Sequence, residues 1–305
     1  MTGRIVTLGE ALGVLRTREV GSLAHLSELS FGTGGAEANV AIGASRLGAT
    51  AVYVGRIGAD SVGQRIAREL RAEGVDARLT IDHDAATGIL LKESPRPGQT
   101  DVTFHRTGSA GSRISPADLD ELELTSDDIL HVTGILPALS HNGRATLARA
   151  LDLADAAGAA ISFDVNHRSK MWTTAEASPV YRATAARATI VFAGEEEALL
   201  LSELDSLGIA EFVLKRGERG AVATVEGQTF SADAVRITPV DTVGAGDAFV
   251  AGYLSARLND ASVPERLDLA VHCGALACLH PGDWEGAPTR AEIAAFGSGA
   301  DPVRR

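Results

Sequence analysis

Short apolar runs alternate with amphipathic stretches along most of the chain. The runs are rich in Val, Ile and Phe, which is typical of buried strands, and they lie at 51–54, 129–132, 160–163, 189–192 and 212–214. Apolar residues at helical spacing follow several of these runs, at 63–73, 143–157 and 195–204. This alternation predicts an α/β fold with a central, mostly parallel sheet that is covered by helices on both faces.

Two segments break the alternation, from about 11 to 31 and from about 87 to 106. Both consist of short strand-like runs joined by turns, and the sequence Pro-Arg-Pro-Gly at 95–98 predicts a hairpin loop in the second. We expect the two segments to form a small β-sheet lid, inserted in a single domain that spans residues 1–305. Such a sheet would exclude water from a site, and it could also be the contact between subunits of a homo-oligomer.

Composition and charge exclude several classes of protein. Hydrophobic residues make up 45% and charged residues 22% of the 305 positions, as in an ordinary globular protein. The net charge of −12 argues against nucleic acid as a partner. No apolar stretch approaches the roughly 20 residues that span a membrane, and no secretory signal opens the chain. Cys273 and Cys278 are too few for a disulfide framework. We therefore expect a cytoplasmic protein that binds no membrane.

The sequence Asp-Thr-Val-Gly-Ala-Gly-Asp at 241–247 carries the strongest chemical signal. Gly244 and Gly246 permit backbone conformations closed to other residues, and a helix pattern follows, so their N–H groups can point at an anion. Asp247 lies in the same turn, where its charge would repel a bound phosphate. A carboxylate is useful there if it takes a proton from a hydroxyl that attacks the phosphate. The alternative is a tight turn with an acidic cap at the start of a helix.

A second glycine-rich helix entry lies at 32–41. Gly34 and Gly35 would let a ligand approach the backbone, and Asn39 would project an amide suited to sugar hydroxyls. Close packing of a helix on the sheet is the alternative interpretation. Other polar residues follow strand-like runs, and the carboxyl ends of parallel strands share one edge of the sheet, where ligands bind. We expect five residues to converge there: Asp164, Asn166, Arg168, Lys215 and Asp247.

The two glycine-rich motifs together resemble those of the ribokinase (PfkB) family of carbohydrate kinases. The resemblance extends over nearly the whole chain, and it implies a ribokinase-like core with a β-lid, ATP as phosphoryl donor, and Mg²⁺. It further implies that Asp247 is the general base and that the backbone N–H groups of Gly244, Ala245 and Gly246 form an anion hole.

Three further segments, at 106–116, 163–172 and 282–286, are similar to those of 2-keto-3-deoxygluconate kinases. This sugar acid carries a carboxylate, to which Arg106 and Arg168 could donate charge-assisted hydrogen bonds. The alternative for each arginine is a structural ion pair, for example between Arg168 and Asp164. We also place Asn166 and Phe104 among the substrate-binding residues. Leu90 and Phe104 stand where this group often has tyrosines, which leaves open the galactonate epimer or a neutral ketose.

On the nucleotide side, the resemblance assigns Lys215, Gly217 and Gly220 to ATP binding, although Lys215 could instead be a solvated lysine at the end of a strand. The usual Asn-x-x-Glu of the family is here Gly-Glu-Glu-Glu at 194–197. Glu197 keeps the carboxylate that helps to order magnesium and phosphate. Asp241 could hold a monovalent cation such as K⁺, or it could cap a turn.

Three other functions compete with a sugar-acid kinase. A non-catalytic sugar sensor could keep the fold, but the intact Gly-Ala-Gly-Asp at 244–247 argues against it. A dinucleotide-dependent oxidoreductase needs a Gly-x-Gly-x-x-Gly turn after the first strand, which residues 8–13 do not supply. A nucleoside kinase would not need Arg106 and Arg168.

Overall fold

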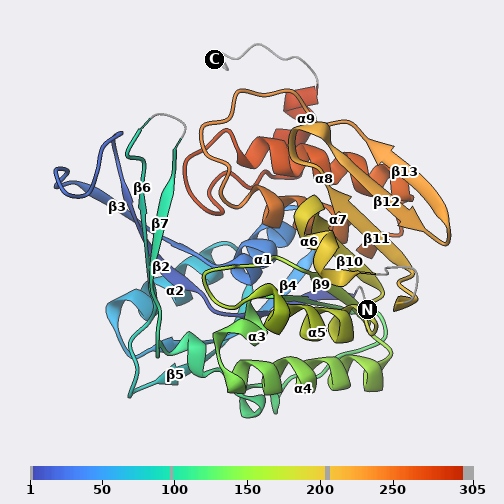
Figure 1. The fold of residues 1–305 in the computed structure, drawn as a ribbon, viewed down its shortest axis with the longest axis horizontal. Helices are drawn as coiled ribbons and strands as arrows, with labels where there is room; N and C mark the ends of the chain where they lie inside the picture. The colour runs from blue at the N-terminus through green and yellow to red at the C-terminus, as the bar shows by residue number, and fades with distance from the viewer. Residues whose placement is uncertain (1–2, 97–98, 203–206, 298–305) are drawn as a thin grey trace.

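A nine-stranded sheet forms the centre of the computed structural model, which describes residues 3–96, 99–202 and 207–297 (Figure 1). The seven strands from β5 to β11 in the sheet order are parallel, and β12 and β13 add an antiparallel edge. In sheet order the strands are β13 (Gln228–Ala232), β12 (Ala221–Val225), β11 (Glu211–Lys215), β10 (Ile190–Gly194), β9 (Ala160–Asp164), β8 (Ile129–Thr133), β1 (Arg4–Gly9), β4 (Thr50–Gly58) and β5 (Asp76–Asp82). The predicted parallel sheet is confirmed.

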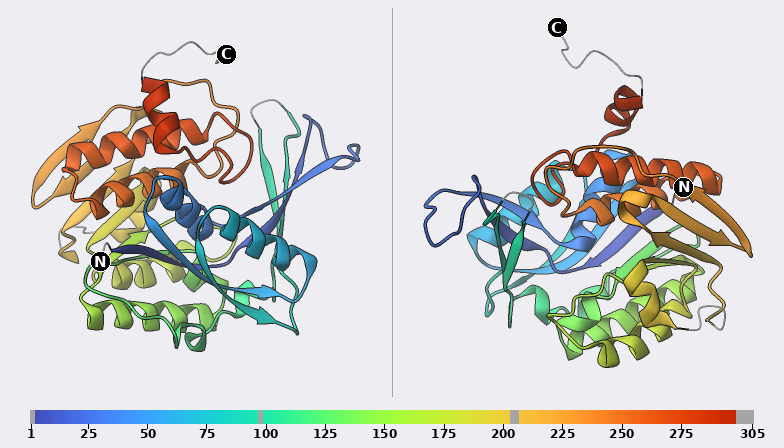
Figure 2. Two further views of the ribbon diagram at one scale, coloured as in Figure 1. Left: turned by 180° about the vertical axis from the view of Figure 1, so that it is seen from behind. Right: turned by 45° about the horizontal axis from the view of Figure 1, so that its top comes forward.

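Helices cover both faces of this sheet, as the apolar periodicity predicts. In the right-hand view of Figure 2 the strands lie between green helices below and orange-red helices above. Ile5 packs into the core on one face and Val6 into the core on the other, because successive side chains of a strand alternate. One face carries α1 (Ala36–Arg46), α2 (Ser61–Ala72), α7 (Ala245–Leu258) and α8 (Val263–Ala277); the other carries α3 (Leu136–Leu139), α4 (His141–Ala157), α5 (Thr174–Ala185) and α6 (Glu195–Leu201).

Local sequence fixes where several helices begin and end. The Asp60 carboxylate caps α2 by accepting a hydrogen bond from the Gly63 N–H. Gly158 ends α4 with a left-handed backbone, φ 70°. Helix α6 ends at Leu201, earlier than the predicted 204, and Leu204 lies outside the described residues. Short 3₁₀ turns lie at Gly111–Arg113, Pro116–Leu119 and Gly217–Arg219, and α9 (Arg290–Gly297) follows at the C-terminal end.

The two segments that break the alternation form a separate four-stranded sheet, here called the lid. Its order is β3 (Leu29–Gly34), β2 (Leu12–Thr17), β6 (Ile89–Glu93) and β7 (Asp101–His105). Both segments are antiparallel hairpins, joined by parallel pairing of β2 with β6. In Figure 1 the lid stands to the left of the core. The hairpin prediction at 95–98 is confirmed, although Pro97 and Gly98 themselves lie outside the described residues.

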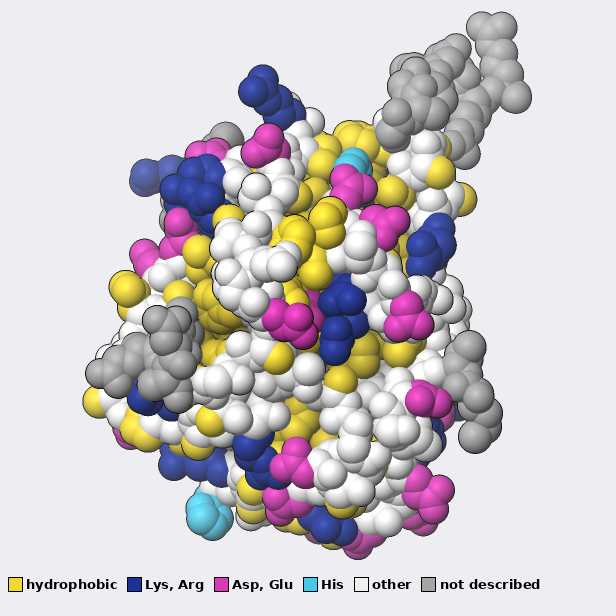
Figure 3. Space-filling view, turned by 90° about the vertical axis from the view of Figure 1, so that its right-hand side faces the viewer, with side chains coloured by type: hydrophobic (Ala, Val, Ile, Leu, Met, Phe, Trp, Pro, Cys, Tyr) yellow, Lys and Arg dark blue, Asp and Glu magenta, His cyan; other side chains and the backbone are white. Residues whose placement is uncertain are grey.

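Charge and polarity at the surface agree with the composition. On the face shown in Figure 3, side chains of both signs are interspersed, and the described Lys and Arg residues do not merge into one basic field. Among the described residues no helix is long and apolar enough to cross a membrane. Cys273 in α8 and Cys278 at its end are both buried free thiols, as expected of small apolar side chains.

Candidate active site

The first turn of α7 is the centre of the site. Gly244 precedes the helix with φ 79°, a left-handed conformation that favours glycine. A Cβ at Gly244 would also overlap the carbonyl oxygen of Asp283, so the loop at 282–286 packs directly on this turn. Asp247 lies in the first turn of the helix. Gly244 has no side chain to cap this helix start, and the Ala245 N–H donates to the Thr242 carbonyl at 3.3 Å. The other N–H groups of the turn have no side-chain cap and can point at an anion.

Two cavities flank this turn. The first has a volume of about 700 Å³ and includes Ala245 and Gly246 in its wall. The second has a volume of about 390 Å³ and includes Gly244 and Asp247. Residues only one or two positions apart therefore face different cavities, and the turn forms the partition between them. We call these the nucleotide-side cavity and the sugar-side cavity, according to the residues that line each.

The sugar-side cavity gathers most of the residues predicted for substrate binding. Its predicted members are Gly35, Asn39, Phe104, Arg106, Arg168, Gly244 and Asp247. Two predicted residues do not line it: a Cβ at Gly34 would meet the carboxylate of Asp283, and Asn166 is buried with φ 39° two residues after β9. Leu90 and Phe104 present apolar side chains to the cavity from the lid, so no side-chain hydroxyl enters the cavity from these two positions.

Asp247 is held by the second glycine-rich motif. The Asn39 side-chain amide donates a hydrogen bond of 2.8 Å to Asp247 Oδ2. Burial raises the pKa of the Asp247 carboxyl to about 7, and the nearby carboxylate of Asp164 adds to this. The bond from Asn39 and the charges of Arg168 and Lys215 oppose the rise. A carboxyl group with this pKa is half-ionised near neutral pH, which suits a general base.

Arg106 forms a structural ion pair, which was one of the two interpretations of the sequence. Its partner is Glu10, which the sequence analysis did not name. Arg106 Nη2 lies 2.5 Å from Glu10 Oε2, and the Ser109 hydroxyl donates to the other oxygen of the same carboxylate. Glu10 is buried at the end of β1, and burial raises its pKa against the lowering effect of Arg106. The guanidinium also lies over the Phe104 ring, with Cζ 5.4 Å from its centroid. Arg106 is therefore held rigidly in the cavity wall.

Arg168 is the less restrained of the two arginines. It is exposed at the mouth of the sugar-side cavity, and its Nη1 donates to the carbonyl of its neighbour His167 at 3.2 Å. The considered pairing with Asp164 is not formed, because Asp164 accepts from Lys215 Nζ at 2.7 Å instead. Among the described residues Arg168 makes no ion pair. Its charge is available to a ligand.

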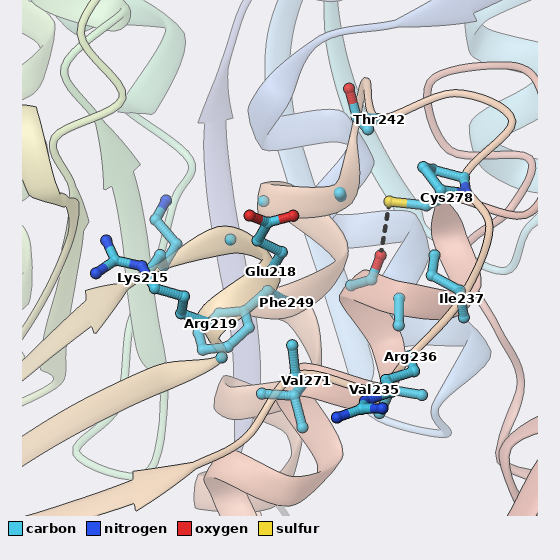
Figure 4. Close-up of a pocket in the computed structure, with 18 residues that line it drawn as sticks. Lys215, Glu218, Arg219, Val235, Arg236, Ile237, Thr242, Phe249, Val271 and Cys278 are labelled. Atoms are coloured by element: carbon cyan, nitrogen blue, oxygen red, sulfur yellow. Dashed lines mark hydrogen bonds between the residues drawn. The ribbon is translucent and has the colours of Figure 1, made fainter. Parts of the chain in front are cut away.

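The nucleotide-side cavity contains the residues predicted for ATP. Lys215, Gly217, Gly220 and Gly246 all line it. Figure 4 shows Lys215 and Arg219 on one side and Ile237 and Cys278 on the other, with Val271 between them. A Cβ at Gly246 would lie 3.8 Å from Lys215 Nζ, so the ammonium is close to the α7 turn. An apolar wall beside a cation and free N–H groups suits a base and its phosphates.

Glu197 has a structural partner at each oxygen. Oε1 accepts from the His167 N–H at 2.8 Å and Oε2 from the Gly194 N–H at 2.7 Å. Glu197 thereby fixes the start of α6 to the loop after β9, and it is not among the residues that line the two cavities. The space beside Gly194 is open apart from Glu197 itself. The proposed roles of Glu197 in ATP and metal binding remain predictions.

Asp241 does not stand free beside the turn. Its Oδ2 lies 2.5 Å from the ammonium of Lys92, a buried residue of lid strand β6. Asp283, which also lines the sugar-side cavity, lies on the other side of this ammonium, at 3.8 Å. Burial raises the pKa of Asp283 to about 7. The sequence analysis missed Lys92 and Asp283, although a lysine that alternates in phase with the apolar Leu90 is a signal for an inward-facing charge.

Comparison with known proteins agrees with this geometry. A model of the pfkB family carbohydrate kinases matches residues 2–290. The chain is 36% identical to a 2-dehydro-3-deoxygluconokinase of Bacillus subtilis, covering 95% of this chain and 94% of that one. It is 32% identical to a 2-dehydro-3-deoxygalactonokinase of Haloferax volcanii, covering 93% of each.

Solved structures have the same ribokinase-like fold. A PfkB protein from Polaromonas sp. JS666 is similar with a TM-score of 0.85 and 34% identity, over 96% of this chain and 99% of that one. A putative ribokinase II from E. coli, in complex with ATP and Mg²⁺, is similar with a TM-score of 0.88 and 25% identity, over 98% and 100%. The chain belongs to the pfkB family of carbohydrate kinases, and it is an ATP-dependent sugar kinase.

Proposed function

We propose that this kinase phosphorylates the primary hydroxyl of a sugar acid, 2-keto-3-deoxygluconate above others, with Asp247 as the general base. The observation that carries the proposal is the partition formed by the first turn of α7. Asp247 faces the sugar-side cavity, and Gly246 faces the nucleotide-side cavity beside Lys215. An acceptor hydroxyl on one side and a terminal phosphate on the other would meet at this turn.

The proposed chemistry needs few groups. The Asp247 carboxylate accepts the proton of the sugar hydroxyl as that oxygen attacks the γ-phosphate in line. The N–H groups of Gly244, Ala245 and Gly246 stabilise the charge that spreads over the phosphate oxygens. Lys215, whose ammonium pairs with Asp164, lies beside them and can donate to the same oxygens. Bound Mg²⁺ supplies further charge neutralisation on the nucleotide.

The donor set around the turn is compatible with Mg²⁺, which prefers oxygen ligands and keeps several waters of its own. Glu197 would hold such a water, because each carboxylate oxygen accepts one N–H group and retains a second lone pair. Among the described residues no group of three or more His, Cys, Asp or Glu could hold a metal alone. The nucleotide phosphates would therefore provide most of the remaining ligands. The sequence also offered Asp241 as a monovalent-cation ligand, but its carboxylate is paired with Lys92.

The preference for an acid is supported by the cations in the sugar-side cavity. Arg168 has no acidic partner among the described residues, and Lys170, which donates only to the Val102 carbonyl at 3.3 Å, lines the cavity next to it. Arg106 is already neutralised by Glu10, so it would orient a carboxylate more than attract one. Relatives named for 2-dehydro-3-deoxygluconate and for its galactonate epimer support the same substrate class, and the epimer is the second candidate.

We also propose that the kinase is cytoplasmic and that two copies associate through the lid. Val20 and Leu29 of the lid region are 56% and 38% exposed, and such apolar side chains favour burial against another subunit. The division into one domain of residues 1–305 with an inserted lid also stays a proposal.

The decisive experiment measures ATP-dependent phosphorylation of a panel: 2-keto-3-deoxygluconate, its galactonate epimer, fructose and ribose. We expect the highest kcat/KM for 2-keto-3-deoxygluconate and values about 10–150-fold lower for the neutral sugars, since a charge-assisted contact is worth about 1.5–3 kcal/mol. A neutral sugar as the best acceptor would contradict the proposal. Binding of the acid without any turnover would indicate a sensor instead.

A further inference from the structure

Lys92 is an unusual residue for a lid strand. Its side chain is only 5% exposed, although lysine is among the residues least often buried. It alternates in phase with Leu90 on β6, so both side chains face inward from the lid. A buried ammonium is costly unless oppositely charged groups surround it. The groups around Lys92 therefore explain why it is there.

Two carboxylates from the core surround the ammonium. Nζ lies 2.5 Å from Asp241 Oδ2 and 3.8 Å from Asp283 Oδ1, an oxygen that is buried without a hydrogen-bond partner. Asp241 immediately precedes the turn that opens α7, and Asp283 packs on that turn at Gly244. A single ammonium from the lid therefore bridges the two segments that shape the anion-binding turn.

The Asp241 carboxylate does not fit a monovalent cation, which was one of the two interpretations of the sequence; it caps a turn, which was the other. Oδ1 accepts from the Val243 N–H at 3.1 Å, and Oδ2 accepts from both Lys92 and the Gly282 N–H, the latter at 3.2 Å. Both oxygens are thus already engaged by donors within the chain. One unit of positive charge is also already present, so a metal cation would meet the Lys92 ammonium as well as the carboxylate.

We propose that Lys92 is a positioning residue whose ammonium replaces a monovalent cation beside the α7 turn, so that turnover is independent of added K⁺. The inference rests on the proposed anion-binding function of that turn. Lys92 belongs to β6, and Leu90 of the same strand lines the sugar-side cavity, so one lid strand contacts both the sugar side and the anion-binding turn. The structure thereby assigns to the lid a second function besides covering the sugar.

The test compares wild type with Lys92→Met, which keeps the volume and removes the charge. Each protein is assayed in tetramethylammonium chloride and in KCl at equal ionic strength. We expect wild-type kcat to be equal in both salts within twofold, whereas K92M loses at least tenfold in kcat without K⁺ and regains at least fivefold with K⁺ or NH₄⁺. Arg16→Met removes a lid cation that contacts Ser30 instead, and it should remain independent of K⁺.

A second measurement does not depend on activity. KCl should raise the Tm of K92M by about 2 °C or more relative to tetramethylammonium chloride, because the cation binds the folded state, and it should leave wild type unchanged. In the double variant K92M/D241N, in which both charges are removed, neither Tm nor kcat should respond to K⁺. The double variant also keeps the proposal testable if K92M alone fails to fold. A response of kcat or Tm of the folded double variant to K⁺ would overturn the proposal.

Three further results would overturn the inference: strong activation of wild type by K⁺, full activity of K92M without K⁺, or a folded K92M that no cation restores. Failure of the proposed function can be distinguished from failure of this inference. If only the proposed function is wrong, no variant phosphorylates a sugar acid, but the Tm of K92M still rises with K⁺.

Discussion

The side-chain amide of Asn39 lies 2.8 Å from the carboxylate of Asp247, which is 208 positions away in the sequence. Asn39 belongs to α1 and Asp247 to α7, two helices that pack side by side. The Oδ1 atom of Asn39 is buried without a hydrogen-bond partner in the described part of the chain. The two glycine-rich motifs are thus physically one site, in which the first orients the acid of the second.

Replacing Asp247 by Asn should lower kcat by about two to four orders of magnitude, since that is the usual contribution of a general base. The Asn39 bond can persist, because the new side chain keeps an acceptor oxygen. ATP binding, measured by calorimetry, should be unchanged, because the N–H groups of the turn remain. Near-normal turnover would show that another group takes the proton.

The pH profile of kcat/KM should report the same carboxyl group. The base acts only when ionised, and burial raises the pKa of Asp247 to about 7, so kcat/KM should fall as the pH drops below about 7 and level off above it. The pKa of Asp283 is also about 7, so the two groups titrate together. D283N should therefore keep the acid limb; if the limb vanishes in that variant, it belongs to Asp283.

The raised pKa of Asp247 also has a consequence for stability. Its folded pKa of about 7 exceeds the unfolded value of about 3.9, so the folded state binds the proton more tightly. The stabilisation is fully present below pH 4 and is lost as the pH rises through 7. Asp247→Asn removes this loss. The free energy of unfolding of D247N relative to wild type should therefore rise by about 1–2 kcal/mol between pH 5 and pH 8, a modest change because water partly screens the group. Urea unfolding at both pH values measures this, and a constant difference would refute it.

Arg168→Gln should weaken the binding of sugar acids selectively. Loss of a charge-assisted contact should raise KM for the acid about 10–100-fold, with a smaller change in kcat and none in the poor turnover of fructose. Arg149→Gln is the matched control, since Arg149 is an exposed residue of α4 that is not among the residues lining either cavity. Equal effects on acid and neutral acceptors would show that Arg168 does not contact the carboxylate.

A pair of glycine variants separates backbone strain from close packing. Gly227 and Gly244 both have φ 79°, but a Cβ at Gly227 meets nothing within 4 Å, whereas one at Gly244 overlaps the Asp283 carbonyl. Gly227→Ala should cost about 1–2 kcal/mol of unfolding free energy and leave turnover intact. Gly244→Ala should cost more and abolish turnover, because the anion-binding turn must move. Similar unfolding free energies and similar turnover for the two variants would contradict this account.

The architecture could be predicted from the sequence, because strands and helices follow from the local periodicity of apolar residues. Alternating strands and helices and the two lid hairpins were predicted from spacing and turn chemistry. Asp247 was predicted from its turn, whereas the ATP-binding role of Lys215 came from the family resemblance. Helix α6 was predicted too long, since its apolar pattern continues past Leu201, where the helix ends.

The missing parts of the site depend on contacts between distant segments. Lys92 and Asp241 are 149 positions apart, and their pairing requires the register of the lid against the core. Glu10 was overlooked as the partner of Arg106 for the same reason. Asn166 was predicted in the cavity wall because it follows a strand, but its φ of 39° turns the chain there, and the sequence does not specify such a turn.

The wall of the nucleotide-side cavity comes from one stretch of chain, between Lys215 and Cys278. The sugar-side wall is assembled from many short pieces between Glu10 and Asp283, several of them in the lid. Exchanging lid residues other than Lys92 would therefore change the acceptor wall and leave the residues that line the donor cavity in place. This separation makes the lid the natural region in which acceptor preference diverges in evolution, and the first region to randomise when engineering a kinase for a new acceptor.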